Sequence, residues 1–265
     1  MRLPKTSRTH TELKELRLGT GDYAAGGARS PPFLELDNAR RRRPLVFGEI
    51  TDDLSSYPET AASMFSGRQN DPVEWAVMWK EIGADGICVR ITGDDHDHAT
   101  GLVSEICRRT RLPVIVDASH GCSEKVRGSV KDSILIVFSE DVLKDGHLAA
   151  VHCMDADEAS NRCGKDDAIV SFPLKDGSGD IRHIVERIES YRNRGLEGDA
   201  TCSNPVLVDV SGVWDRSDDG DVRKISMHEA VTALAVMMAG ADIVVVKGPG
   251  AADMARVYGE ELADL

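Results

Sequence analysis

Short runs rich in valine and isoleucine recur through most of the chain, and they constrain its fold more than any other feature of the sequence. Each run is apolar at successive positions, as expected of a strand that is covered on both faces. Segments of helical periodicity separate the runs, and this alternation is typical of a parallel sheet. Eight parallel strands can close into a barrel that has no exposed edge. The eight runs are Pro44–Ile50, Gly86–Ile91, Leu112–Ser119, Ser133–Phe138, His147–Cys153, Ala168–Leu174, Pro205–Gly212 and Asp242–Gly248.

We therefore predict an α/β chain folded as a (β/α)8 TIM barrel over residues 44–265, with shortened helices and an N-terminal arm or hairpin over residues 1–43. The rival architecture is a doubly wound sheet, whose dinucleotide-binding form needs a glycine-rich turn directly after the first strand. The sequence at that point, EITDDLSSYPE, contains no glycine. This absence and the number of strands favour the barrel.

Three segments carry strong helix signals. Asp71–Gly83 begins with an acidic cap and Pro72 and ends at a glycine, Asp180–Arg194 places its isoleucines on one stripe, and Ser226–Ala239 opens with a capping-box pair before Gly240. Only about a dozen residues join the third and fourth strands, and about ten join the fourth and fifth. We expect those two connections to hold one or two helical turns each.

The arm mixes polar and glycine-rich pieces, and we expect it to be an appendage to the barrel. It ends in a basic run, Arg40 to Arg43, directly before the first strand. Isolated charge runs usually lie in water, so a solvated turn is one interpretation of this run. A local contact with an anion or with another subunit is the other interpretation.

Charge and cysteine content exclude several classes of protein. The 265-residue chain has a formal charge of −13, which opposes binding to nucleic acid because phosphate neutralisation needs a basic face. It has no apolar run long enough to span a bilayer, and its polar N-terminus lacks the apolar centre of a secretory signal, so we expect a cytoplasmic protein. The six cysteines contain no CxxC pair, which favours reduced thiols over disulfides, zinc or an iron–sulfur cluster.

The candidate functional residues follow the strands, because the loops of a (β/α)8 barrel converge at the carboxyl ends of its strands. Polar groups and glycines there suit a bound ligand or a partner surface, and the acidic ones suit a general base or a metal. Ordinary polar loops are the alternative interpretation. These residues are Glu49, Asp52, Asp53, Arg90, Thr92, Asp94, Asp117, Ser119, His120, Ser139, Glu140, Cys153, Asp155, Lys175, Asp176, Ser211, Gly212, Trp214, Lys247, Gly248 and Gly250.

Two motifs have competing interpretations. GDDHDHATG (Gly93–Gly101) contains metal-ligand types, but neighbours in sequence rarely converge on one ion, so we predict a polar loop that leads into a helix around Leu102–Arg108. KGPGAADMA (Lys247–Ala255) places glycines before a helix start, which suits either a structural turn or an anion site. Cys153 has no assignable histidine partner, so we predict a core thiol.

Three stretches together resemble the delta subunit of the acetyl-CoA decarbonylase/synthase complex, which is equivalent to the small subunit of the corrinoid iron–sulfur protein. The resemblance lies in their order and spacing, and they cover about half of the chain. The stretches are ELRLGTGDYAAGGARSPPFLELDNARRRRPLVFGEITDD, DPVEWAVMWKEIGADGICVRI and HEAVTALAVMMAGADIVVVKGPGAADMARVYGEEL.

The resemblance implies a (β/α)8 barrel that pairs with a larger gamma-type subunit carrying an iron–sulfur cluster and a cobalamin domain, among other subunits of the complex. The corrinoid would lie between that domain and the barrel mouth, and a methyl group would pass from a methylated pterin through cobalt to the acetyl-CoA-forming centre. Such a subunit needs no catalytic residue, cluster or metal ligand of its own. The residues that would face the corrinoid are Asp52, Thr92, Ser119, Ser211, Gly212, Lys247, Gly248 and Gly250.

The alternative hypothesis is an enzyme in its own right, a pterin-binding methyltransferase or a barrel like dihydropteroate synthase. That chemistry requires Asp or Asn side chains that bind the pterin ring inside the barrel. Asp117 and Asp209 are the available candidates, and no asparagine ends any strand. A barrel used only for assembly is a third hypothesis.

Overall fold

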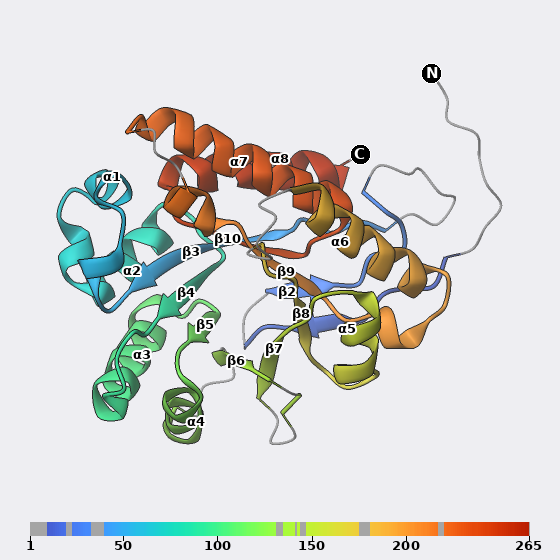
Figure 1. Cartoon of the computed structure of the whole chain (residues 1–265), viewed down its shortest axis with the longest axis horizontal. Helices are drawn as coiled ribbons and strands as arrows, with labels where there is room; N and C mark the ends of the chain where they lie inside the picture. The colour runs from blue at the N-terminus through green and yellow to red at the C-terminus, as the bar shows by residue number, and fades with distance from the viewer. Residues whose placement is uncertain are drawn as a thin grey trace.

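A closed barrel of eight parallel strands forms the centre of the molecule (Figure 1). The computed structural model describes residues 10–19, 23–32, 40–130, 135–140, 142–143, 147–174, 181–216 and 220–264. The strands follow chain order around the barrel, and the last pairs with the first. They are β3 (Leu45–Thr51), β4 (Gly86–Arg90), β5 (Val114–Asp117), β6 (Leu135–Ser139), β7 (Leu148–His152), β8 (Ile169–Ser171), β9 (Val206–Asp209) and β10 (Ile243–Val246).

The predicted (β/α)8 barrel is therefore confirmed, and each of the eight apolar runs overlaps one strand. The start of the fourth run, at residues 133–134, lies outside the described residues. All seven residues of β3 and all four of β10 are buried, because one face of each strand fills the barrel and the other meets the helices.

Helices cover the outside of the barrel (Figure 1). The expected helix after Asp71 is confirmed, since the Asp71 side chain accepts hydrogen bonds from the backbone N–H groups of Val73 and Glu74. The helices are α1 (Glu59–Ala62), α2 (Pro72–Glu81), α3 (His96–Thr110), α4 (His120–Ser129), α5 (Ala156–Arg162), α6 (Ile181–Leu196), α7 (Val222–Ala239) and α8 (Pro249–Asp264). Short 3-10 turns are η1 (Leu54–Ser56), η2 (Ser63–Phe65), η3 (Arg68–Asn70), η4 (Ala200–Cys202) and η5 (Ser211–Arg216).

Three helix predictions were wrong in their bounds. Helix α7 begins at Val222 instead of Ser226, because Asp221 caps it by accepting from the N–H groups of Arg223 and Lys224. Helix α3 begins at His96, within the motif that we expected to be a loop, because Asp95 caps it in the same way. Helix α4 has ten residues, nearly three turns at 3.6 residues per turn, and so is longer than the one or two turns expected.

The N-terminal arm forms an antiparallel pair, β1 (Glu15–Arg17) and β2 (Ala24–Gly26). The expectation of an appendage is wrong for this part of the arm. Leu16, Leu18 and Ala25 are buried in one apolar cluster with Leu45 and Ile243, the first residues of two barrel strands. The hairpin thus closes the floor of the barrel, at the end opposite the carboxyl ends of the strands.

Ion pairs tie the basic run to the arm and to the barrel. Arg40 pairs with Glu12 and Glu15, and Arg42 also pairs with Glu15. Arg43 donates two hydrogen bonds to the carboxylate of Asp85, at 2.8 and 2.6 Å. The solvated-turn interpretation is therefore wrong for Arg43, whose partner carboxylate is only 7% exposed.

Candidate functional site at the barrel mouth

A cavity of about 350 Å³ opens at the carboxyl ends of the barrel strands. Strand side chains alternate between two faces, so residues two positions apart on a strand share the inner face. On each strand, an apolar residue points into the barrel, and the residue two positions later points into it at the mouth. This ring contains one residue from or directly after each strand: Glu49, Arg90, Asp117, Phe138, His152, Ser171, Asp209 and Lys247.

Arg90 lies among three carboxylates. Its Nε donates to Glu49 Oε2 at 2.8 Å, and its two terminal nitrogens donate to Asp117 and Asp209. Burial alone would raise the pKa of Asp209, but the Arg90 charge and the hydrogen bonds from Ser211 lower it. Burial likewise opposes the charge of Arg90, and the carboxylates outweigh it and raise the pKa of the guanidinium. Arg90 and Asp209 are therefore both ionised at neutral pH.

Lys247 is the second cation of the mouth. Its Nζ donates to Asp215 Oδ1 at 3.0 Å, lies 3.4 Å from Glu49 Oε1, and stands 4.8 Å above the centre of the Tyr57 ring. Burial alone would lower the pKa of Lys247, but Glu49 and Asp215 raise it. Lys247 therefore stays protonated and cannot act as a neutral nucleophile at neutral pH.

Glu49 is held at this position by packing below it. The backbone carbonyl of Glu49 accepts a hydrogen bond from Trp79 Nε1 at 3.0 Å, and the Trp79 ring lies directly against Gly48. A Cβ at position 48 would lie 2.0 Å from the ring, so only glycine fits there. The sequence pair Gly48 and Trp79 thus sets where the first carboxylate of the mouth lies.

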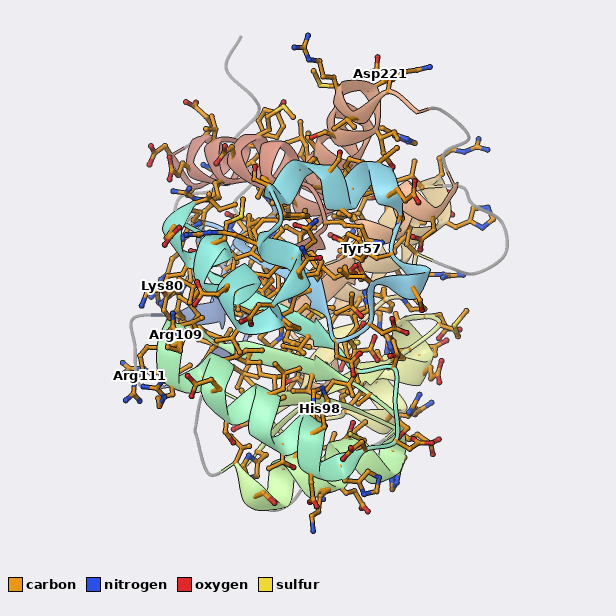
Figure 2. All side chains as sticks on the ribbon, turned by 90° about the vertical axis from the view of Figure 1, so that its left-hand side faces the viewer. Tyr57, Lys80, His98, Arg109, Arg111 and Asp221 are labelled. Carbon is orange, nitrogen blue, oxygen red and sulfur yellow. The ribbon has the colours of Figure 1, made fainter. Side chains whose placement is uncertain are left out.

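Two buried hydroxyl groups that line the cavity have no hydrogen-bond partner. Ser171 is 1% exposed and Tyr57 is 9% exposed. Tyr57 follows η1 at the side of the barrel that Figure 2 faces. Burial, together with Glu49, raises the pKa of Tyr57, which keeps its hydroxyl protonated. Because an unpaired buried hydroxyl is costly, both groups are suited to a ligand that supplies the missing partner.

Phe138 and His152 form a flat wall of the cavity. Their rings stack with 4.5 Å between centroids and an angle of 12° between planes. Partial burial lowers the pKa of His152, so at neutral pH the imidazole is uncharged. Both rings of the wall are therefore uncharged, and a planar ligand could stack against them.

A carboxylate of the protein itself occupies the backbone amides after β10. Glu229 accepts from Lys247 N at 2.6 Å, from Gly248 N at 2.9 Å and from Trp214 Nε1 at 2.8 Å. Burial raises the pKa of Glu229 to about 8, against the effect of these hydrogen bonds. Of the two interpretations of this glycine motif, the structural turn is the one that this contact supports, because the side chain of Glu229 already occupies these two amides.

The structure brings together only some of the predicted corrinoid-facing residues. Thr92, Ser211, Gly212 and Lys247 line the cavity. The others do not line it: Asp52 accepts from Thr92 N and Thr92 Oγ1, both at 2.9 Å, Ser119 Oγ donates to Asp94 at 2.8 Å, Gly248 binds Glu229, and Gly250 lies in the first turn of α8.

The other candidates divide in the same way. Asp117 and Asp209, the residues of the pterin hypothesis, both line the cavity. Cys153 is a buried core thiol as predicted, and its hydrogen bond with Cys163, together with burial, raises its pKa. Lys175 and Asp176 lie outside the described residues. His98 lies on α3, away from Tyr57 (Figure 2), and among the described residues no group of three His, Cys, Asp or Glu side chains is arranged to hold a metal ion.

Sequence reasoning missed Tyr57, Phe138, His152, Ser171 and Asp215. Three of them were readable from the two-residue alternation, since Phe138, His152 and Ser171 come two positions after the inner residues Ile136, Ala150 and Ile169. Tyr57 and Asp215 lie in loops, where no periodicity marks the inner face.

The fold resembles that of solved dihydropteroate synthases. No model of a known protein family matches the chain, and no curated protein sequence does either. Solved structures do match. Dihydropteroate synthase from Thermus thermophilus is 16% identical with a TM-score of 0.56, over 87% of this chain and 97% of that one. Dihydropteroate synthase from Yersinia pestis, in a sulfonamide drug complex, is 14% identical with a TM-score of 0.57, over 83% of this chain and 93% of that one. At these identities the likeness establishes a shared (β/α)8 fold.

Proposed function

We propose that the mouth cavity binds a pterin or a closely similar bicyclic heterocycle, and that the chain is a pterin-binding enzyme of the dihydropteroate synthase or methyltransferase kind. The observation that carries the proposal is the convergence of Asp117 and Asp209 in one cavity of about 350 Å³. Small-molecule pockets usually measure about 300 to 1,000 Å³, so this one suits a ligand of bicyclic size. A Thermus thermophilus dihydropteroate synthase with the same fold was solved with a ligand designated 6HMPPP.

The chemistry of the cavity supports such a ligand. The amino-pyrimidine edge of a pterin carries N–H donors, and the ionised carboxylate of Asp209 is an acceptor. Asp117 and Asp209 remain 34% and 28% exposed beside Arg90, and a carboxylate has about four acceptor positions, so each can bind both Arg90 and a ligand. The flat wall of Phe138 and His152 suits a planar ring.

The polar groups of the mouth would bind and orient this ligand. Ser171 and Tyr57 would give hydrogen bonds to its heteroatoms, and the protonated Lys247 would stabilise negative charge that develops on it. Lys247 is protonated and Cys153 lies in the core, so neither supplies an amine or thiol nucleophile to the cavity. We infer that the attacking group belongs to a second substrate.

The test is a titration of the purified chain with methyltetrahydrofolate and with an unmethylated dihydropterin, followed by calorimetry. We expect binding of at least one of them, and a loss of affinity of at least about tenfold in Asp209→Asn, because a charge-assisted hydrogen bond contributes roughly 1.5 to 3 kcal/mol. Asp94→Asn is the matched control, since Asp94 binds Ser119 and does not line the cavity. Absence of binding to both pterins, with normal circular dichroism, would contradict the proposal.

A second candidate is the non-catalytic, corrinoid-sheltering subunit. What favours it is that four of the residues predicted to face a corrinoid lie together at the mouth cavity: Thr92, Ser211, Gly212 and Lys247. A corrin macrocycle is larger than the cavity, so Thr92, Ser211 and Gly212 fit it only as a covering surface. Co-expression with a gamma-type subunit tests this candidate: a stable complex that protects cobalamin, with no pterin affinity in the isolated chain, would favour it over the enzyme.

A further inference from the structure

A buried cluster joins the loops that follow β9 and β10, directly beside the mouth cavity. Its centre is Glu229, which is 0% exposed and is the one acidic residue within α7. The loop after β9 contributes Ser211, Gly212 and Asp215 to the cavity, and Lys247 directly follows β10. Glu229 itself does not line the cavity, so an effect of Glu229 on a ligand there would be indirect.

The carboxyl group of Glu229 contacts both loops. On the side of β10 it accepts from the backbone N–H of Lys247 at 2.6 Å and from that of Gly248 at 2.9 Å. On the side of β9 it accepts from Trp214 Nε1 at 2.8 Å. A Cβ on Gly248 would lie 2.9 Å from Glu229 Oε2 and 3.0 Å from Trp214 Cζ2, so these residues pack tightly against one another. One carboxyl group therefore fixes the two loops relative to α7.

The side chain of Lys247 depends on the same two loops. Its Nζ donates to Asp215 Oδ1 at 3.0 Å, and Asp215 directly follows Trp214 in η5. The same Nζ lies 3.4 Å from Glu49 Oε1. Lys247 is thus held at its backbone by Glu229, and its ammonium group is held by a turn that Glu229 binds through Trp214.

We propose that Glu229 is a positioning residue for Lys247, and that it acts with Trp214 to hold the loops after β9 and β10 in the arrangement that a ligand at the mouth meets. The effect on a ligand rests on the proposed function, whereas the position of Lys247 can be tested without any ligand. Glu229→Gln is the first variant. Whichever way its carboxamide is turned, the NH₂ group faces at least one of the three N–H donors, so at least one of these contacts is lost.

The test measures how fast a limiting amount of acetic anhydride acetylates Lys247 in the folded full chain, as followed by mass spectrometry. Only a neutral amine reacts, and Lys247 is 4% exposed and paired with Asp215. In the parent we therefore expect Lys247 to react more slowly than Lys80, an exposed residue of α2 in the same sample. Glu229→Gln should raise the ratio of Lys247 to Lys80 acetylation at least about threefold, because the ammonium group is no longer held in place.

Trp214→Phe is the second variant, and it keeps the proposal testable if Glu229→Gln does not fold. It retains an aromatic ring and removes the N–H donor that binds Glu229. We expect the ratio to rise at least about twofold, because η5 and its Asp215 lose their link to Glu229. A ratio that stays at the parent value in the folded variants would overturn the proposal.

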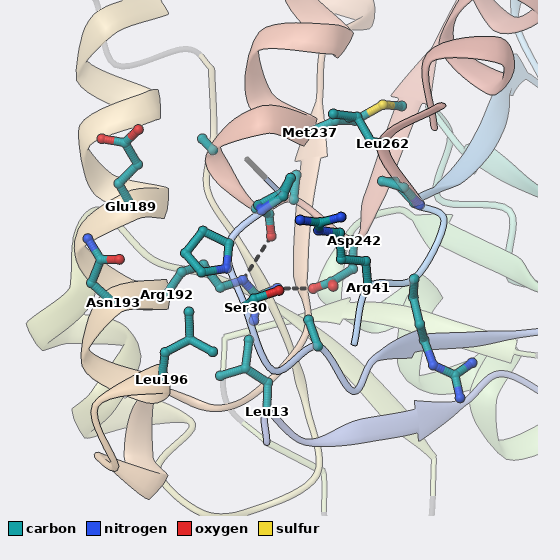
Figure 3. Close-up of a pocket in the computed structure, with 18 residues that line it drawn as sticks. Leu13, Ser30, Arg41, Glu189, Arg192, Asn193, Leu196, Met237, Asp242 and Leu262 are labelled. Carbon is teal, nitrogen blue, oxygen red and sulfur yellow. Dashed lines mark hydrogen bonds and ion pairs between the residues drawn. The ribbon is translucent and has the colours of Figure 1, made fainter. Parts of the chain in front are cut away.

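Met237→Ala is the matched control. Met237 is buried in the last turn of α7, where it lines a cavity of about 170 Å³ together with Leu196 and Leu262 (Figure 3). Its truncation weakens the packing of the same helix and leaves the loops at the mouth in place, so the ratio should match that of the parent. An equal rise in Met237→Ala and Glu229→Gln would show that Glu229 only stabilises the fold, and it would overturn the proposal.

A pterin titration separates this inference from the proposed function. If the parent binds a dihydropterin, Glu229→Gln should weaken that binding at least about threefold, since the ammonium group of Lys247 is displaced. An unchanged affinity in a variant whose acetylation ratio has risen would overturn the effect on the ligand. If the parent binds no pterin, the proposed function is contradicted, and the acetylation ratios still decide whether Glu229 positions Lys247.

Discussion

Arg90 is the residue on which the electrostatics of the mouth depend, because its guanidinium is shared by Glu49, Asp117 and Asp209. Glu49 is 3% exposed, so its charge has little access to water. Without Arg90 the three carboxylates would face one another with Lys247 as the remaining cation of the cavity lining. The mouth therefore needs Arg90 for folding as well as for any ligand that binds beside it.

We expect Arg90→Gln to lower the free energy of unfolding at neutral pH by about 3 to 5 kcal/mol, the cost of breaking a buried ion pair. The lowered pKa of Asp209 stabilises the parent above the ordinary carboxylate range, and this contribution is lost as pH falls through the lowered pKa. The difference between parent and variant should thus shrink as pH falls below 3.8, the ordinary value for an aspartate. Urea unfolding across that range measures it. Arg108→Gln is the control, because it removes an exposed, solvent-screened pair with Glu105 and should change the free energy of unfolding far less than Arg90→Gln does.

Glu229 gives a second pH dependence, of opposite sign. Its folded-state pKa, about 8, lies above the ordinary value of 4.5, so the folded state keeps a proton that the unfolded state has lost. Between these two values its contribution to stability falls by about 1.4 kcal/mol per pH unit. We expect Glu229→Gln, which does not titrate, to lose this slope. Unfolding of both proteins at intervals from about pH 5 to about pH 8 checks it, and a constant difference between them would contradict it.

At the scale of the element, two glycines illustrate opposite uses of the same residue. A Cβ on Gly48 of β3 would lie 2.0 Å from Trp79, whereas a Cβ on Gly101, inside α3, would meet nothing within 4 Å. Gly48 is therefore required by close packing. Gly101 only gives the unfolded chain additional freedom.

We expect Gly48→Ala to destabilise the chain by about 1 to 3 kcal/mol or more, because the added carbon overpacks the contact between β3 and α2. Gly101→Ala should instead stabilise it by about 0.5 to 1 kcal/mol, since alanine is the better helix former. Thermal unfolding of the two variants beside the parent measures both effects. A neutral Gly48→Ala would mean that Trp79 can move aside.

The strands and helices also show which parts of the structure could be predicted from the sequence and which could not. The strands were predictable because Val and Ile at successive positions have few other places in a soluble fold, and Asp71 with Pro72 marks a helix start by local hydrogen bonding alone. The start of α7 was missed because Asp221 and Ser226 are both plausible caps. At the mouth, Asp117, Asp209 and Lys247 could be predicted because each lies at the carboxyl end of a strand. The Arg90 and Glu229 contacts join residues that are far apart in sequence, so only the closed barrel reveals them.

At the scale of the whole molecule, the arm and the barrel share one core. Leu18 is 1% exposed and belongs to the apolar cluster that also contains Phe47 and Val245 from inside the barrel.

Among the described residues no helix is both long and apolar enough to cross a membrane.

We expect Leu18→Ala to cost about 2 to 5 kcal/mol, as truncation of a buried leucine usually does. If the arm were an independent appendage, the same change would leave the unfolding of the barrel unaltered. Arg17→Ala is the control, because Arg17 is the exposed residue directly before Leu18. Denaturant unfolding followed by tryptophan fluorescence reports on the barrel, since Trp75 and Trp79 lie on α2.

The hairpin at the floor of the barrel limits the route by which molecules can reach the barrel interior. Leu16, Leu18 and Ala25 close the floor of the barrel. A molecule that binds among the inner residues at the mouth must therefore enter and leave through the mouth. Two molecules bound one above the other would then have to enter in a fixed sequence and leave in the reverse one. An ordered sequence of binding and release would then follow from the closed floor of the barrel, whatever the two ligands are.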